Sequence, residues 1–166
     1  MMHKPIRDLH ALMYTSIADP NLSPQDIEQL VNNARRNNAR HGLTGLLVFQ
    51  EGCFLQILEG DRKKLSNLFE QKLMRDPRHS AVNLFYDEAL HERRFRFWHL
   101  AFSDLNQQSV RISSPYRECL NSERGLYELN RDTAKALALV RQIHRRVLCA
   151  QAPEQLSQHS RPGENP

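Results

Sequence analysis

The chain has 166 residues, of which 40% are hydrophobic and 25% are charged, and its formal net charge is +4. These values are ordinary for a globular protein, and the length suits one domain with a short appendage. Because no apolar run reaches the roughly 18 residues of a membrane-spanning helix and the N-terminus lacks a signal-peptide core, we expect neither a membrane protein nor a secreted one.

The cysteines and arginines indicate the compartment of the protein and argue against nucleic-acid binding. The three cysteines, Cys53, Cys119 and Cys149, share no C-x-x-C spacing, which favours reduced thiols in the cytoplasm. The positive charge comes from arginine runs at 35–36, 93–96 and 141–146. No aromatic residues interleave with these runs as in RNA-binding strands, so solvated faces are a better interpretation than nucleic-acid binding.

The first half of the chain predicts a strand, a helix and a hairpin. Residues 9–16 alternate like a strand. Ser23, Pro24 and Asp26 are typical of a helix start, and Gly42 is typical of a helix end. Between them, the apolar stripe of an amphipathic helix is formed by Ile27, Leu30, Val31 and Ala34. Strands at 43–50 and 53–59 flank a turn at Glu51-Gly52.

A second helix and two more strands follow. The helix is predicted from Arg62 to Arg75, where Asp76-Pro77 ends it, and the strands at 81–90 and 95–103. The order βαββαββ indicates an α+β, ferredoxin-like sheet with two helices on one face. Further helices at 115–120 and 132–149 would cover the other face, and the polar residues 151–166 are predicted to be disordered.

Most enzyme motifs are missing from the sequence. It contains no H-E-x-x-H, G-x-S-x-G, Walker A or G-x-G-x-x-G pattern. The eight histidines are scattered, so a metal site is not expected. We therefore expect a protein that is not an enzyme and that binds no metal.

One buried amide is out of place in this pattern. Gln56 lies within the apolar strand CFLQILEG, and a buried amide without partners costs about 1–3 kcal/mol for each unsatisfied group. If the first and third strands are neighbours, Tyr14 and Ser16 lie on the same face as Gln56, and the phenol can bond the amide. A tyrosine–glutamine pair of the core, completed by backbone or water, is the alternative.

Two consecutive amides favour a ligand. Asn37 and Asn38 end the first helix, where they could cap its last carbonyls or point across the sheet. Together with a buried phenol and a buried amide, they suit a flat heterocycle with alternating donors and acceptors, held in a mostly apolar pocket.

Five motifs follow one another in order along the chain: L-x-Y-x-S from Leu12, R-x-N-N-x-x-x-G-L-T-G from Arg35, F-L-Q-I-L-E-G from Phe54, R-D-P-R-H from Arg75 and F-x-x-W-H from Phe95. With this set, the sequence resembles the BLUF family, blue-light sensors that use FAD, from about Leu9 to Ser103. Each motif is weak alone, and the ordered set is specific.

The resemblance implies a role for each matching residue. Tyr14 would donate an electron and a proton to the excited flavin, and Gln56 would bridge the Tyr14 hydroxyl and the flavin N5/O4 edge. Asn38 would bond the flavin carbonyl and ring N–H, with Asn37 beside it. The remaining cofactor contacts would come from Ser16, Arg78 and His79, and the signal relay from Trp98 and Leu100.

Two positions depart from the family pattern. Leu100 stands where the family usually has methionine, and it lacks the polarizable thioether. Ala34 stands where many members have a small hydroxyl residue, which would alter the spectrum or the recovery rate. Neither departure touches the Tyr14–Gln56 pair, so photochemistry is expected and the relay is the part expected to differ.

The predicted organisation is a flavin-binding domain at 1–104, a helical cap at 105–150 and a disordered tail at 151–166. As in short members of the family, the signal would pass to a separate downstream protein, and a homo-oligomer is expected. The alternatives are a ferredoxin-like regulatory module without photochemistry and, more remotely, a basic RNA-binding domain.

Overall fold

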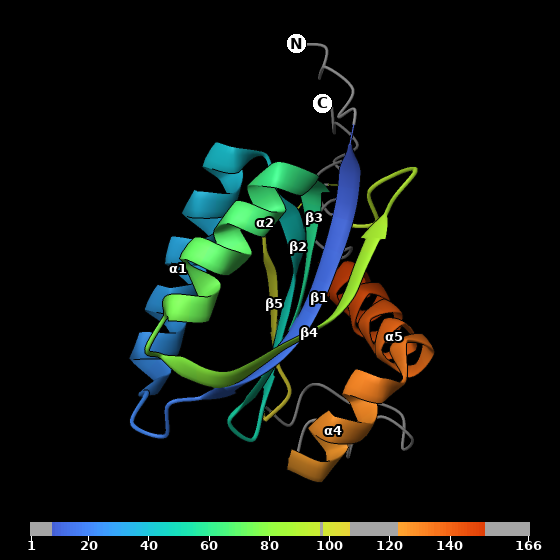
Figure 1. Cartoon of the computed structure of the whole chain (residues 1–166). Coiled ribbons are helices and arrows are strands. Elements are labelled where there is room, and N and C mark those ends of the chain that lie inside the picture. Colours follow the sequence, from blue (N-terminus) through green and yellow to red (C-terminus); the bar gives the residue numbers. More distant parts are fainter. Residues whose placement is uncertain (1–7, 97, 107–122, 152–166) are drawn as a thin grey trace, which may run out of the picture.

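The computed structural model describes residues 8–96, 98–106 and 123–151, and Figure 1 labels their elements. The strands are β1 (Leu9–Ala18), β2 (Thr44–Gln50), β3 (Cys53–Asp61), β4 (His79–Ala89) and β5 (Ala101–Asp104). The helices are α1 (Pro24–His41), α2 (Arg62–Gln71), α4 (Glu123–Arg131) and α5 (Thr133–Gln151), together with the short 3₁₀ helix η1 (Leu73–Arg75).

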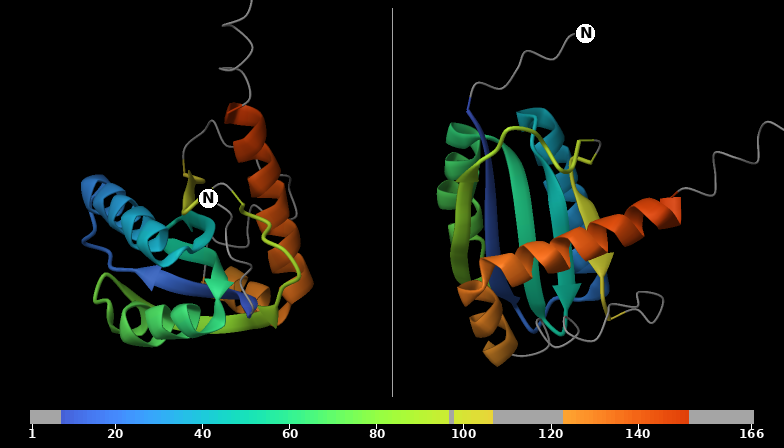
Figure 2. Two further views of the ribbon diagram at one scale, coloured as in Figure 1. Left: turned by 90° about the horizontal axis from the view of Figure 1, so that it is seen from above. Right: turned by 90° about the vertical axis from the view of Figure 1, so that its right-hand side faces the viewer.

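The strands form one sheet in the order β4-β1-β3-β2-β5. All neighbours are antiparallel except β2 and β5, which are parallel. Helices α1 and α2 lie on one face, and α5 crosses the other face (Figure 2). This arrangement confirms the predicted α+β, ferredoxin-like fold, in which two crossover helices share a face of the sheet.

Helix α1 begins and ends where the sequence predicts. The Ser23 hydroxyl accepts from the Asp26 backbone N–H at 3.2 Å, and the Asp26 carboxylate accepts from the Ser23 N–H at 2.8 Å. This reciprocal pair satisfies donors that the first turn leaves open. Gly42 closes the helix in the left-handed region, with φ of 66°, where a residue without a side chain is favoured.

Each face of the sheet carries its own apolar core. On the α1/α2 side, Leu12, Phe54, Leu58 and Leu65 are buried together. On the α5 side, Met13, Leu55 and Ile57 pack against residues of α4 and α5. The alternation of these residues along β1 and β3 is the strand period read from the sequence.

The second helix ends earlier than predicted. It was expected to reach Arg75, but α2 ends at Gln71, and the chain continues as η1 over Leu73–Arg75. A 3₁₀ turn is common where a helix ends, because it satisfies the last carbonyls with shorter-range bonds. The change of helix type turns the chain toward Asp76 and Pro77.

The predicted strand at 95–103 is wrong over its first half, because β5 contains Ala101–Asp104 alone. Side chains from other elements bond the preceding backbone instead. The buried Glu59 carboxylate accepts from the N–H groups of Arg94, at 2.8 Å, and Phe95, at 3.2 Å. The His99 and Leu100 carbonyls accept from two side chains of α1. With these backbone groups satisfied, the segment does not need a strand ladder.

Helix α5 lies within one or two residues of the predicted range 132–149, whereas α4 was not predicted. The expected helix at Pro115–Leu120 and the expected tail beyond Gln151 lie outside the described residues. Helix α4 is held to the sheet by Leu126 and Leu129, which are buried, and by a 2.8 Å hydrogen bond from the Thr15 hydroxyl to Asn130.

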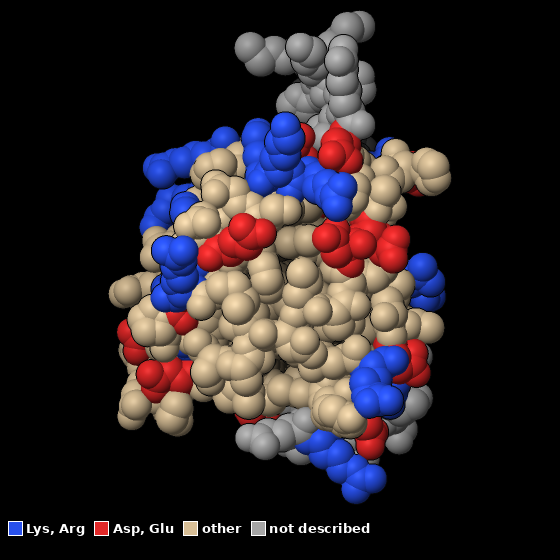
Figure 3. Space-filling view, in the orientation of Figure 1, with Lys and Arg blue, Asp and Glu red and all other residues tan. Residues whose placement is uncertain are grey.

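Within the described part of the chain, no helix combines the length and apolar character needed to cross a membrane. Charged side chains of both signs surround an uncharged centre on the face drawn in Figure 3. On this face, positive and negative side chains are interspersed rather than gathered into one broad basic patch.

Candidate functional site

Tyr14 and Gln56 lie directly opposite each other in the antiparallel pair of β1 and β3. The two side chains are 3% and 5% exposed, and the Tyr14 hydroxyl donates a hydrogen bond to Oε1 of Gln56. Burial raises the pKa of Tyr14 above its usual value of about 10, with a smaller contribution from the negative charge of Asp76. The phenol is therefore neutral and keeps its proton on the oxygen that faces Gln56.

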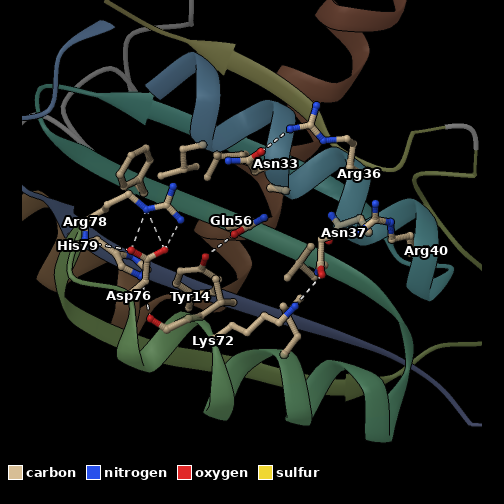
Figure 4. Close-up of a pocket in the computed structure, with 18 residues that line it drawn as sticks. Tyr14, Asn33, Arg36, Asn37, Arg40, Gln56, Lys72, Asp76, Arg78 and His79 are labelled. Atoms are coloured by element: carbon tan, nitrogen blue, oxygen red, sulfur yellow. Dashed lines mark hydrogen bonds and ion pairs between the residues drawn. The ribbon is translucent and has the colours of Figure 1, made fainter. Parts of the chain in front are cut away.

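The pair lies on the wall of a cavity of about 380 Å³ between α1 and the α2–η1 segment, above β1 and β3 (Figure 4). That volume is within the range of small-molecule sites. Its apolar walls are Leu30, Ala34, Leu47, Phe54, Leu58, Leu68 and Leu73. Its polar lining is Tyr14, Asn33, Arg36, Asn37, Asn38, Arg40, Gln56, Lys72, Asp76, Arg78 and His79.

Two amides in this lining have one end bonded and the other end open. Gln56 accepts from Tyr14, and its Nε2 makes no hydrogen bond with any described residue. Asn38, 2% exposed, donates from Nδ2 to the His99 carbonyl at 2.7 Å, and its Oδ1 has no hydrogen-bond partner among the described residues. The cavity therefore offers a donor and an acceptor that a ligand with the complementary pair would satisfy.

His79 supports the same wall with a fixed pattern of bonds. Its Nε2 lies 2.8 Å from the Leu73 carbonyl, which can accept but not donate, so Nε2 carries the proton. In the neutral ring the other nitrogen, Nδ1, accepts from the Ser16 hydroxyl at 2.8 Å. Ser16 is thus behind the lining rather than in it, and it acts on the cavity through His79.

An ion pair closes one end of the cavity. Arg78 donates to both carboxylate oxygens of Asp76, at distances from 2.5 to 3.1 Å. These bonds from Arg78 hold the pKa of Asp76 below its usual range, and the same pairing raises the pKa of Arg78. Both groups are therefore charged at neutral pH, and their charges largely cancel.

The predicted site residues separate into two groups. Tyr14, Asn37, Asn38, Gln56, Arg78 and His79 line one cavity, with Ser16 behind it. The two predicted relay residues do not line it. Trp98 packs with the α5-side core, and Leu100, 3% exposed, belongs to the α1/α2-side core.

Sequence reasoning missed the polar residues that α1 adds to the cavity. Asn33, Arg36 and Arg40 line it beside Asn37, and these four positions fall at i, i+3, i+4 and i+7. That spacing marks one helix face, so it could have predicted the set once Asn37 was chosen. Lys72, also missed, donates to Asn37 Oδ1 at 2.8 Å and so joins α2 to α1.

The described residues contain no group of three or more histidine, cysteine or acidic side chains placed to hold a metal ion. The buried polar groups that do converge are amides, a phenol and an imidazole over apolar walls. Fold and site together define a ferredoxin-like domain that holds a flat, hydrogen-bonding organic ligand between its helices.

The family model for sensors of blue light using FAD (BLUF) matches residues 9–101. The chain belongs to this family, and its cofactor is accordingly FAD. The residues present fit that group, because the open Nε2 of Gln56 and Oδ1 of Asn38 suit the adjacent carbonyl and N–H of a flavin ring. The matched region is a light-sensing module rather than a catalytic one.

Curated relatives are light-regulated proteins of greater length. The chain is 34% identical over 87 residues to photoactivated adenylate cyclase subunit beta of Euglena longa, covering 52% of this chain and 10% of that protein. It is 34% identical over 82 residues to the blue light- and temperature-regulated antirepressor BluF of Escherichia coli K12, covering 49% of this chain and 20% of that protein. The chain thus spans a tenth to a fifth of these relatives.

Solved structures share the fold over a longer range. The dark-state structure of BlrB, a BLUF protein, aligns with a TM-score of 0.62 at 25% identity, covering 87% of this chain and 98% of that one. A bacterial light-regulated adenylyl cyclase aligns with a TM-score of 0.59 at 26% identity, covering 86% of this chain and 36% of that one.

Proposed function

We propose that blue light switches the hydrogen bonds of Tyr14 and Gln56 in the FAD-bound protein. The observation that carries this proposal is the half-satisfied amide of Gln56, which is bonded to Tyr14 at Oε1 and open to the cavity at Nε2. A buried amide in that position can exchange its donor and acceptor ends, and each arrangement presents a different group to a bound ring.

The proposed flavin contacts follow from the lining. Gln56 and Asn38 would bond the ring edge, with Asn37 beside them, and Arg78 and His79 would border the ring and the ribityl chain. Ser16 would fix the His79 ring through its hydroxyl. The exposed cations of α1, Arg36 and Arg40, carry charge that suits the diphosphate of FAD.

Bound FAD supplies the absorption of blue light and an acceptor for one electron. Tyr14 would give that electron to the excited flavin, and its Oη proton would follow through the hydrogen bond to the Gln56 amide. While the phenol has lost its proton, the Gln56 amide would be free to rotate or to tautomerise. The electron and the proton would then return to Tyr14, so that no charge or radical remains on either side chain. Because the side chain is uncharged, the new arrangement persists without a buried charge, and a stronger bond from Gln56 to the flavin carbonyl shifts absorption to the red.

The proposed output route leads from the cavity to α5. Asn38 holds the His99 carbonyl, and the preceding residue, Trp98, contacts His144 of α5 with 5.1 Å between ring centroids. A change at Gln56 or Asn38 therefore has a short path through Trp98 and Leu100 to the C-terminal helices. A local bond change gives a signal when it biases such an element between two arrangements.

On this proposal, residues 1–104 form the sensor and the described helices α4 and α5 form the cap, in a cytoplasmic homo-oligomer that signals to a separate protein. The expected tail lies outside the described residues. The named activities of the Euglena, E. coli and bacterial cyclase proteins illustrate the range of outputs joined to such sensors.

The test is the visible spectrum of the purified protein in darkness and under blue light. We expect a yellow protein whose flavin bands move reversibly to longer wavelength, because the bonds to the ring change. A colourless protein that does not take up added FAD would instead favour the regulatory module without photochemistry. A yellow protein without the shift would remove the Tyr14–Gln56 switch while leaving FAD in place.

A further inference from the structure

Helix α5 has one apolar face and one basic face. Ala136, Leu139, Val140 and Ile143 are buried against the sheet. On the opposite side Arg141, Arg145 and Arg146 are exposed, and they line a shallow groove of about 390 Å³ with Ala138 and Gln142. In the right-hand view of Figure 2, α5 runs across the outside of the sheet, and no described element covers its outer side.

The charge on this face is not balanced locally. The 19 residues of α5 include Lys135 and these three arginines but no Asp or Glu. At the average of the whole chain, 19 acidic residues in 166, a helix of that length would hold about two. The three arginines form no ion pair or hydrogen bond with the described residues, whereas Arg35 and Arg93 bond oxygens that are distant in the sequence.

The arrangement also has a cost for the helix. Arg141 and Arg145 are four residues apart, and like charges at that spacing repel across one turn. The helix dipole offers little compensation, because its effect is confined to the last turn and α5 has no basic residue there. A local feature that opposes helix stability, with no compensating contact, is typical of a functional surface.

We propose that the face of α5 formed by Arg141, Arg145 and Arg146 binds an acidic segment of a partner protein. Three guanidinium groups within about 7.5 Å of helix rise match carboxylates spaced one turn apart on a partner helix. Nucleic acid suits the face less well, because affinity for a duplex rests on the number of phosphates that the protein neutralises, and three arginines neutralise few. Control of this binding by light rests on the proposed function, whereas the binding of an acidic segment to α5 does not.

The test uses a helical 16-residue peptide with glutamate at i and i+4, and a control peptide with glutamine at those positions. Each peptide carries a red-absorbing dye, so that anisotropy is read without exciting the flavin. We expect the full chain to bind the glutamate peptide and not the glutamine peptide. Arg141→Gln/Arg145→Gln/Arg146→Gln should weaken binding at least ten-fold.

A matched variant, Arg62→Gln/Lys63→Gln/Arg75→Gln, removes the same charge from the exposed surface of α2 and η1 and should change affinity less than two-fold. Arg141→Glu/Arg145→Glu should bind a lysine peptide instead. That result would identify this face of α5 as the binding surface even if the neutral variant folds poorly. Equal loss in both triple variants, or displacement of the peptide by a 20-base-pair DNA at equal concentration, would overturn the proposal. The flavin spectrum is recorded separately, so failure of the photochemistry is distinguished from failure of this surface.

Discussion

Trp98 and His144 are in edge-to-face contact, with ring centroids 5.1 Å apart and ring planes at 84°. His144 also lies 4.7 Å from the ring of Phe95, so the imidazole is held between two aromatic rings of the segment that precedes β5. Trp98 is next to His99, whose backbone carbonyl accepts a hydrogen bond from Asn38 in the cavity lining. The contact therefore joins α5 to the segment that Asn38 holds. Trp98 thus lies on the α5 side of the sheet, away from the cavity lining.

The His144 contact predicts a pH-dependent stability. Burial lowers the pKa of His144 below 6.5, so the unfolded chain takes up the proton first as the pH falls. This contribution to stability is therefore present above about pH 6.5 and is lost as the pH falls from there toward the folded-state pKa. His144→Phe should flatten the dependence of the urea midpoint on pH between about 7 and 5.5.

Tryptophan fluorescence gives a second measurement of the same contact, because the chain has a single tryptophan. Protonation of His144 should quench Trp98 emission below pH 6.5, and His144→Phe should remove that quenching. The control is His91→Phe, since His91 is exposed and, unlike His144, has no ring contact with Trp98 among the described residues. Quenching that persists in the His144 variant would show that another group titrates beside Trp98.

Tyr14→Phe should leave FAD bound and abolish the red-shifted state, because phenylalanine has neither the proton nor the ease of oxidation. Stability should fall by roughly 1 kcal/mol, since Gln56 Oε1 loses its donor. Difference spectra under blue light measure the shift, and Tyr127→Phe, at an exposed position of α4, is the control. A normal photocycle in Tyr14→Phe would exclude this phenol from the mechanism.

Gln56→Leu should also abolish the red shift, because leucine cannot exchange a donor for an acceptor. The variant leaves the buried Tyr14 hydroxyl without its acceptor, so the free energy of unfolding should fall by about 1–3 kcal/mol. Gln50→Leu replaces another buried glutamine, on β2, and should keep the photocycle. If Gln56→Leu kept the shift, the amide would not be the switch.

Leu100→Met should change the coupling to α5 more than the spectrum. Leu100 is buried but does not line the cavity, and methionine has a similar volume, so stability should change by less than about 1.5 kcal/mol. Light-induced hydrogen exchange in α5 measures the coupling, and absorption measures the site. A large spectral change with unaltered exchange in α5 would contradict a relay role.

Much of the fold was predictable because its signals are local. The capping box at Ser23 and Asp26, the stop at Gly42 and the alternation along β1 and β3 depend on residues close in the sequence. The parity of Tyr14 and Gln56, combined with the split βαβ order, was sufficient to place them on one face of neighbouring strands. The structure confirms this placement and adds the register, in which the two residues are directly opposite and hydrogen-bonded.

The segment before β5 was mispredicted because its backbone bonds distant side chains. Glu59 accepts from residues 35 and 36 positions away, and Arg93 donates to the Glu59 carbonyl at 2.7 Å and the Gly42 carbonyl at 2.6 Å. The sequence of 95–103 is apolar and aromatic, which is typical of a strand, and these long-range contacts cannot be recognised from it. Helix α4 was missed for a similar reason, since burial of Leu126 and Leu129 on the sheet stabilises a short helix.

The sequence by itself determined the βαββαββ order of the flavin-binding domain, the face that carries Tyr14 and Gln56, and the family, because periodicity and ordered motifs are local properties of the chain. The tertiary structure decided which amide atoms of the site are left to bond a ligand. Gln56 Nε2 and Asn38 Oδ1 lack partners among the described residues because Tyr14 and the His99 carbonyl take the other end of each amide. It also decided that Trp98 meets His144, since that contact depends on where α5 crosses the sheet.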